Sequence, residues 1–299
     1  MKKISILPEH VANQIAAGEV VQRPASVVKE LMENSLDSGA SEIKVNIINA
    51  GKTSIQIIDN GDGIEKDQIK RAFIRHATSK LNTADDLFSL NTMGFRGEAL
   101  ASICAISQVN LKSRTADSEA TYQITLDENI EGEILNSVGS VGTTITVKNL
   151  FYNVPARRQF LKSEPLEFRH ISEAFTRIAL ANPKIKFTLK HNNKEEAQFE
   201  SENLRQRISH VLGKKINESL VPVEESTEVV SIDGFVLRPN NAKKSKGNQY
   251  LYVNKRHIKN NYLHKSIIEA FEGLVAPGMH PLYVLKFTVP DDRVDVNVH

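Results

Sequence analysis

The sequence predicts an α+β protein of two domains. Segments in which apolar and polar residues alternate, as strands require, are interspersed with segments that have the 3.6-residue apolar period of helices. These segments form two apolar blocks, separated by a polar stretch at 191–203. A chain of 299 residues is also long enough for roughly two domains. We therefore expect one domain over residues 1–200 and a smaller one over 205–299.

Two helices and a hairpin open the first block. A short helix is expected over 9–17, and a second from Pro24, at a first-turn position, to Gly39 at its exit. Residues 43–57 alternate around a polar turn, which predicts a hairpin whose second strand leads into Asp59. The other expected elements of this block are helices at 65–77, 97–106 and 164–181 and strands at 107–114, 121–127, 143–149 and 185–190.

The second block mixes helices and strands in the same way. Valines alternate at the very end of the chain, which stops at His299 without a turn or a cap. We therefore expect the second domain to be truncated at its C-terminal end, within a longer protein. The expected elements are helices near 203–212 and 261–273 and strands near 229–237, 249–254, 282–289 and 293–298.

Composition excludes several classes of protein. The single cysteine, Cys104, excludes an internal disulfide framework and a cysteine-ligated zinc site. The apolar run at the N-terminus ends before Pro8, which is too short for a secretion signal, and no window reaches the length of a membrane span. A net charge of +2 is uninformative about nucleic acid, so that signal must come from local clustering. A reducing, cytoplasmic setting is the expected default.

Two polar residues border the apolar stripe of the second helix. Glu30 and Asn34 are about one helical turn apart, so they lie on the same side. A carboxylate can take a proton from an attacking water, and an amide oxygen is the kind of hard ligand that Mg²⁺ prefers. On pattern alone, a solvated helix face is the simpler interpretation of both residues. Glu33 and Asp37 fall further round the helix.

An acidic turn with two glycines, Asp59-Asn60-Gly61-Asp62-Gly63, directly follows the second hairpin strand. Gly61 and Gly63 permit a ligand to approach the backbone closely. Asp59 can accept a hydrogen bond from an adenine amino group, a directional contact of the kind that fixes a ligand in a mostly apolar pocket. An ordinary turn is the competing interpretation, because Asp, Asn and Gly dominate turns.

A glycine-flanked loop leads into the helix at 97–106, in the run Gly94-Phe95-Arg96-Gly97-Glu98-Ala99-Leu100. A helix N-terminus offers free N–H groups to phosphate oxygens, and Thr78-Ser79-Lys80 adds two hydroxyls and a cation. The chain has no G-x-x-x-x-G-K-[ST] phosphate loop, so phosphoryl chemistry needs another arrangement. The order of helix acid and amide, strand-end acid, glycine turn and glycine loop predicts a nucleotide pocket.

A basic stretch lies in the second block. From Arg238 to Lys265 there are eight Lys or Arg residues, three interleaved tyrosines, and no Asp or Glu. This pattern is typical of sequence-tolerant contact with a nucleic-acid backbone, and a solvated basic face is the alternative. The residues expected to contact DNA are Lys243, Lys244, Lys246, Lys255, Arg256 and Lys259.

Several long runs resemble the MutL mismatch-repair family, more closely than the wider GHKL ATPase superfamily of gyrase B subunits, heat-shock chaperones and histidine kinases. They are distributed over the whole chain. The runs are NQIAAGEVV at 13–21, RP at 23–24, VVKEL at 27–31, RHATSK at 75–80, GFRGEAL at 94–100, FYNVPARR at 151–158 and VDVNVH at 294–299.

The resemblance implies a fold and a set of site residues. It implies a two-layer α/β sandwich ATPase domain of the Bergerat (GHKL) type, followed by a smaller α/β sandwich resembling the second domain of ribosomal protein S5. ATP and Mg²⁺ would be the cofactors, Glu30 the general base for water, and Asn34 the Mg²⁺ ligand. Asp59 would bind adenine. The residues that would shape the rest of the pocket are Gly61, Gly63 and Thr143 at the adenine end, and Thr78, Ser79, Lys80, Gly94, Phe95, Arg96, Gly97, Glu98, Ala99 and Leu100 around the phosphates.

The resemblance also implies partners. These are DNA bound without sequence preference, a mismatch-recognition protein of the MutS family, and a second copy of the chain in an ATP-dependent N-terminal dimer. The setting would be the bacterial cytoplasm, associated with the nucleoid and without a membrane. The family continues past this His299 with a Pro-x-Lys whose lysine reaches the terminal phosphate, so weak turnover is expected here.

Two other functions stay open beside a DNA-repair ATPase switch. One is a different GHKL enzyme, such as a kinase of protein histidines, although the nine histidines are scattered and no phosphoacceptor helix is evident. The other is a DNA-binding module with a degenerate nucleotide pocket. The presence of Glu30 disfavours that second alternative, since a dead pocket has no need of a base.

Overall fold

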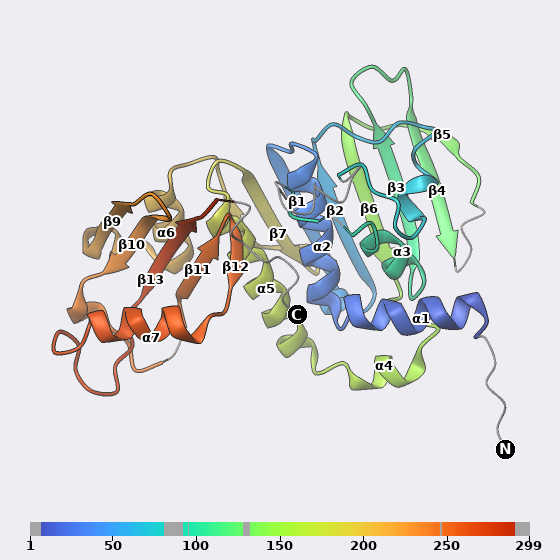
Figure 1. Cartoon of the computed structure of the whole chain (residues 1–299). Coiled ribbons are helices and arrows are strands. Elements are labelled where there is room, and N and C mark those ends of the chain that lie inside the picture. The colour runs from blue at the N-terminus through green and yellow to red at the C-terminus, as the bar shows by residue number, and fades with distance from the viewer. Residues whose placement is uncertain (1–6, 81–91, 95, 128–131, 246, 291–299) are drawn as a thin grey trace. The chain divides into compact units, whose positions relative to one another are not determined.

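The chain forms two compact units, each built around its own β-sheet (Figure 1). The computed structural model describes residues 7–80, 92–94, 96–127, 132–245 and 247–290. The first unit holds the described residues up to Phe175 together with Ile185–Gln198. The second holds Thr176–Lys184 and the described chain from Phe199 onward. The strand expected at 293–298 lies outside the described residues.

The first unit contains an eight-stranded sheet with the order β5-β4-β3-β6-β2-β1-β7-β8. Strand β1 pairs antiparallel with β2 and parallel with β7, which makes the sheet mixed. The strands are β1 (Glu42–Ile48), β2 (Ser54–Asp59), β3 (Gln108–Arg114), β4 (Thr121–Asp127), β5 (Leu135–Ser137), β6 (Gly142–Lys148), β7 (Lys186–His191) and β8 (Lys194–Phe199).

One face of this sheet is apolar and covered by helices. In β1, Ile43, Val45 and Ile47 are buried, while Lys44 and Asn46 point to the other face. Helix α2 packs on β1 and β2, α3 packs on β3 and α2, and α1 packs on α3. The helices of this unit are α1 (Glu9–Val20), α2 (Pro24–Asp37), α3 (Ala99–Cys104), α4 (Pro155–Phe160) and α5 (Glu164–Ala181), whose last turns belong to the second unit.

Helix α2 begins and ends where its sequence predicts. Pro24 occupies the first turn, where its missing N–H costs nothing, and Gly39 at φ 73° reverses the chain beyond the end. The apolar stripe, which includes Val28 and Leu31, is buried against the sheet. The opposite side of α2 is therefore left for polar residues.

Three sequence predictions in this unit differ from the structure. Helix α1 continues through Gly18 to Val20, and the Arg157 guanidinium occupies the space that a side chain at position 18 would fill. Residues 65–77 form isolated turns and one 3-10 turn, with His76 at φ 62°, which no helix allows. The polar stretch at 191–203 contains strand β8, an edge strand of the sheet.

The second unit is a five-stranded sheet, β12-β11-β13-β10-β9, with helices on both faces. Leu180 at the end of α5 and Ile208 of α6 pack on one face around Tyr252. Leu263 and Ile267 of α7 pack on the other around Tyr283. The elements are α6 (Leu204–Leu212), β9 (Leu220–Ser226), β10 (Ser231–Leu237), β11 (Gln249–Val253), β12 (Arg256–Ile258), α7 (Asn261–Ala270) and β13 (Tyr283–Thr288).

A buried arginine fastens α6 to the chain around it. Arg207 is fully buried, and its guanidinium donates to the Glu202 carboxylate at 2.7 Å. It also donates to the main-chain carbonyls of Ala179, Pro183 and Glu200. A buried cation is stable only with such complete pairing. Arg207 therefore holds together the end of α5, the loop after it and the start of α6.

Candidate functional site

Helix α2 presents three polar side chains along one side. Glu30, Asn34 and Asp37 are spaced at i, i+4 and i+7, which places them in a row. The Lys29 ammonium donates to Glu30 Oε1 at 2.9 Å and to Glu33 Oε2 at 3.0 Å. Burial by itself lowers the pKa of Lys29, but the charges of the two glutamates outweigh it and the pKa is raised. The charged lysine thus holds one oxygen of Glu30 in place.

Asp37 is the most heavily bonded member of this row. Its side chain is only 6% exposed, and it accepts from Lys80 Nζ at 2.6 Å. It also accepts from the backbone N–H groups of Met93 at 2.8 Å and Gly94 at 3.0 Å. The same Lys80 ammonium donates to Asn34 Oδ1 at 3.0 Å. The sequence-based placement of Asp37 further round the helix, without a role, is wrong, because a seven-residue spacing returns to nearly the same side of a helix as Glu30.

The strand-end carboxylate is held in a fixed orientation. Oδ1 of Asp59 accepts from the backbone N–H groups of Gly61 at 3.0 Å and Thr143 at 3.1 Å. Oδ2 accepts from the Ser35 hydroxyl of α2 at 2.7 Å. Burial raises the pKa of Asp59, and these three hydrogen bonds only partly offset it. Oδ2 carries one of these bonds and retains capacity for a further donor.

Two predicted glycines are required by backbone packing. Gly63 has φ 78°, and a Cβ there would lie 2.2 Å from the carbonyl oxygen of Arg114. Gly97 has φ 63°, and a Cβ there would lie 2.5 Å from the carbonyl oxygen of Ala77. Both conformations and both contacts exclude any larger residue. These glycines therefore bring separate chain segments together around the site.

The remaining predicted residues lie near one end of this site or the other. Gly94 lies beside Lys80, and the Thr78 hydroxyl accepts from the Lys80 backbone N–H at 3.1 Å. Glu98 precedes the six-residue helix α3, which begins with Ala99 and Leu100, and pairs with His76 at 3.3 Å. The Thr143 hydroxyl bonds to Ser113 at 2.9 Å. Ser79 and Arg96 are exposed, and Phe95 lies outside the described residues.

The basic residues of the second unit fall into two groups. Lys243 and Lys244 are exposed before the start of β11. Lys255 is exposed in the turn after β11, and Arg256 opens β12. The length of β11, on the order of 15 Å, separates the groups. The two other predicted contacts are Lys259, which is exposed beyond β12, and Lys246, which lies outside the described residues.

The side chains beside the second group are not all charged. Burial lowers the pKa of His257 to about 4, and the nearby charges of Arg177 and Lys259 act in the same direction. His257 is therefore neutral near pH 7. Burial also lowers the pKa of Lys286, aided by Lys255 and opposed by Asp233.

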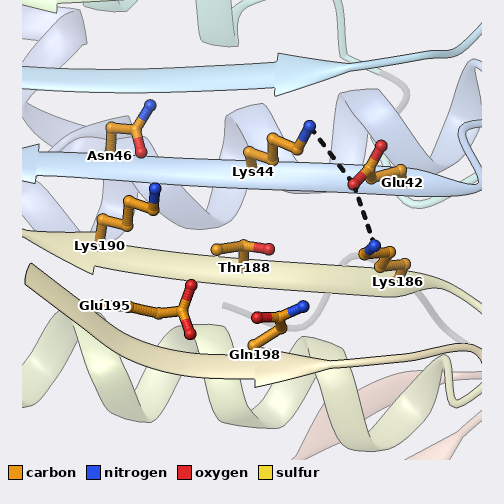
Figure 2. Close-up of a pocket in the computed structure, with 8 residues that line it drawn as sticks. All are labelled: Glu42, Lys44, Asn46, Lys186, Thr188, Lys190, Glu195 and Gln198. Atoms are coloured by element: carbon orange, nitrogen blue, oxygen red, sulfur yellow. Dashed lines mark ion pairs between the residues drawn. The ribbon is translucent and has the colours of Figure 1, made fainter.

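The open face of the first sheet carries shallow hollows that contain none of the predicted site residues. One, of about 290 Å³, is lined by side chains from β1, β7 and β8, with Glu42 paired to Lys44 and Lys186 (Figure 2). Within the described residues, no group of three or more His, Cys, Asp or Glu side chains could hold a metal ion. None of the described helices combines the length and hydropathy that a membrane crossing needs.

Two family profiles and a set of curated proteins match this chain. The profile of the histidine kinase-, DNA gyrase B- and HSP90-like ATPases matches residues 22–145, and that of the DNA mismatch repair protein C-terminal domain matches residues 208–299. The DNA mismatch repair protein MutL of Christiangramia forsetii is 53% identical over 300 residues, which cover 99% of this chain and 48% of that protein. The chain belongs to the MutL family. It spans about half the length of the curated relatives that it matches.

Solved structures of related proteins share the fold of this chain. The MutL ATPase domain of Aquifex aeolicus, complexed with ADP, has a TM-score of 0.70 at 28% identity, over 91% of this chain and 93% of that one. The N-terminal domain of a DNA repair protein has a TM-score of 0.81 at 26% identity, over 96% and 90%. The predicted fold class, a GHKL ATPase domain of the MutL type followed by a second α/β domain, is confirmed.

Asp59→Asn should keep the fold and change how stability depends on pH. Asparagine retains Oδ1 for the N–H groups of Gly61 and Thr143, and its Nδ2 can donate to the Ser35 hydroxyl. In the native chain the raised pKa of Asp59 gives a stabilising contribution below about pH 4, which is lost as the pH rises through that raised value. Thermal unfolding should therefore show that the melting temperature of the variant, relative to that of the native chain, is higher at pH 7 than at pH 4. A constant difference would contradict the prediction.

Proposed function

We propose that this chain binds ATP with Mg²⁺ and hydrolyses it slowly, as the nucleotide-gated part of a MutL protein. The observation that carries the proposal is the placement of two functional ends against one helix. Ser35 of α2 bonds the strand-end acid Asp59, and its neighbour Asn34 bonds the cation Lys80. A ligand with a hydrogen-bonding base at one end and phosphates at the other fits this polarity. The ADP held by the Aquifex aeolicus relative supports the same ligand class.

The adenine end depends on Asp59. Its Oδ1 is committed to two backbone donors, so Oδ2 is the oxygen available to an exocyclic amino group. A fixed acceptor of this kind discriminates adenine from bases that present a carbonyl there, because two acceptors would face each other.

The phosphate end depends on Lys80 and on the row along α2. The Lys80 ammonium can neutralise phosphate charge, and the glycines nearby admit the backbone to the ligand. Glu30 would accept a proton from the attacking water, with Lys29 holding its other oxygen. Mg²⁺, when bound, would neutralise and orient the phosphates. A single protein oxygen such as Asn34 Oδ1 fits Mg²⁺, which usually keeps waters and phosphate oxygens as its other ligands.

Asp59→Asn should abolish most nucleotide binding while leaving the fold intact. The Nδ2 amide would face the adenine amino group as donor against donor, a mismatch that leaves both unpaired. A loss of about fivefold to 150-fold in affinity for ATP is expected by titration calorimetry, since an unpaired polar group costs on the order of 1–3 kcal/mol. Unchanged affinity would place the adenine elsewhere.

Glu30→Gln should bind ATP but lose turnover. The amide keeps the shape of the side chain yet cannot accept the proton of water, so hydrolysis should fall by about 100-fold or more. Single-turnover phosphate release measures the rate, and ATP titration with and without Mg²⁺ measures binding. Asn34→Ala is the matched variant: it should weaken Mg²⁺-dependent binding while leaving Mg²⁺-free binding near the native level. Native turnover in Glu30→Gln would exclude this residue as the base.

We further propose that the second unit contacts the DNA backbone through the β11–β12 turn. Asn254 at φ 45° and Lys255 at φ 68° form a two-residue loop, and Val253 pairs with Arg256 across it. Such a turn favours glycine at the position of Lys255, since other residues are strained there. A strained, exposed lysine at the tip of a hairpin is consistent with a charge kept for binding. The curated relatives are DNA mismatch repair proteins, which favours DNA as the partner of this surface.

Lys255→Gly should lower DNA affinity without lowering stability. Losing one phosphate contact should reduce the slope of log affinity against log salt by about 1, while glycine relieves the turn. Fluorescence anisotropy with duplex DNA at several salt concentrations measures the slope, and thermal unfolding measures stability. Asn193→Gly is the matched control, because Asn193 occupies a similar left-handed position, φ 65°, in the β7–β8 turn. A salt slope equal to that of the native chain would exclude Lys255 from the contact.

The wider role remains part of the same proposal. ATP-dependent pairing of two chains through their N-terminal regions would convert nucleotide binding into a signal, and a MutS-type mismatch-recognition protein would supply the upstream trigger. Such a protein would work on DNA, in association with the nucleoid. Sedimentation with a non-hydrolysable ATP analogue measures dimer formation. If nucleotide binding controls it, the native chain should form dimers and Asp59→Asn should not.

A further inference from the structure

Asp37 joins two chain segments to the same helix as the proposed base and metal ligand. One oxygen of its carboxylate, Oδ2, accepts from Lys80 Nζ and from the Gly94 N–H, while Oδ1 accepts from the Met93 N–H. All three donors come from outside α2. With its side chain 6% exposed, the carboxylate depends on these donors for its solvation.

The Lys80 ammonium bridges Asp37 and Asn34. It lies 2.6 Å from the carboxylate and 3.0 Å from Asn34 Oδ1, so a monovalent cation already occupies the amide oxygen proposed for Mg²⁺. Gly94 lies against this bridge: a Cβ there would be in ordinary van der Waals contact with Lys80 Nζ at 3.4 Å and with Asn34 Oδ1 at 3.5 Å.

Lys80 and Mg²⁺ cannot both be bound to Asn34 at low cost. Mg²⁺ binds oxygen at about 2.1 Å, so with Lys80 on the same oxygen the two cations would be no more than about 5 Å apart. At that distance they repel strongly in a partly buried site. The Asp37 carboxylate cannot offset this repulsion fully, because its negative charge is already paired with the Lys80 ammonium.

We propose that Asp37 is a positioning residue that holds Lys80 on Asn34 in the nucleotide-free protein and releases it when ATP and Mg²⁺ bind. The inference rests on the proposed function, because it takes Lys80 as a phosphate ligand and Asn34 as the metal ligand. Lys80 acts as a built-in cation that satisfies Asn34 and Asp37 until the nucleotide arrives. The lysine then exchanges this pair of oxygens for phosphate oxygens, and Asn34 becomes available to the metal.

Thermal unfolding of Asp37→Asn, Lys80→Met and the double variant tests the pairing first without nucleotide. Each single change should lower the melting temperature by a few degrees, and the double variant should be little worse than the poorer single one, because both remove one interaction. Glu269→Gln is the matched control, since it breaks an exposed pair with Lys265 on α7 and should leave the melting temperature unchanged. Additive losses in the free protein would overturn the proposal.

Titration with a non-hydrolysable ATP analogue and Mg²⁺ then tests the release. Asp37→Asn weakens the nucleotide-free arrangement alone, so its affinity should rise by roughly threefold to tenfold over the native chain, with Glu269→Gln at the native value. Unchanged or weaker binding would show that Asp37 serves both states equally, which overturns the release. If the native chain binds no nucleotide, the proposed function fails, while the melting temperatures still report whether Asp37 and Lys80 are paired.

Discussion

The hydrogen bond between Ser35 and Asp59 is the contact on which the site depends. It joins the last turn of helix α2 to the end of strand β2, 24 residues further along the chain. The Asp62 N–H donates to the Ser38 carbonyl at 2.9 Å and repeats the link at the end of the helix. Because α2 also buries its apolar stripe on the sheet, these polar contacts fix its rotation and its position along the sheet. The position of α2 in turn determines where the polar side chains on its other side lie.

A single helix thus serves packing and chemistry together. Its buried side is apolar, and its other side carries a base candidate, an amide and a carboxylate in one row. The amide and the carboxylate share one lysine, so a change in either alters the partner of the other. Such coupling allows a small ligand to rearrange several contacts at once, since the groups compete for the same cation. A rigid helix keeps the competing oxygens at constant spacing while their partner moves.

In the second unit, the residues that stabilise the fold are different from those proposed to bind DNA. Its core is held by apolar contacts on both sheet faces and by the fully paired Arg207. The described, exposed lysines that are predicted to contact DNA lie outside its helices and strands, and one of them occupies a backbone conformation that favours glycine. Charges in turns can vary with little effect on the core, because they make few buried contacts. Burial lowers the pKa of His257 beside them to about 4, so this residue adds no charge to the basic group even at mildly acidic pH.

The sequence by itself determined the elements whose side chains repeat with a clear period. Alternating isoleucines, valines and leucines defined β1, β2, β3 and β6, and the apolar stripe between Pro24 and Gly39 defined α2. The motif runs also pointed to Glu30, Asn34 and Asp59, since residue type and spacing suffice to recognise them. Only the tertiary structure decided the rest, because it depends on partners distant in the chain. Strand β8 forms at the edge of the sheet despite its polar residues. Arg157 fills the space left by the missing side chain of Gly18 in α1, and Asp37 gains a role from Lys80, 43 residues away. Periodicity reports which side of an element is buried, but it carries no information about which distant donor meets a given carboxylate.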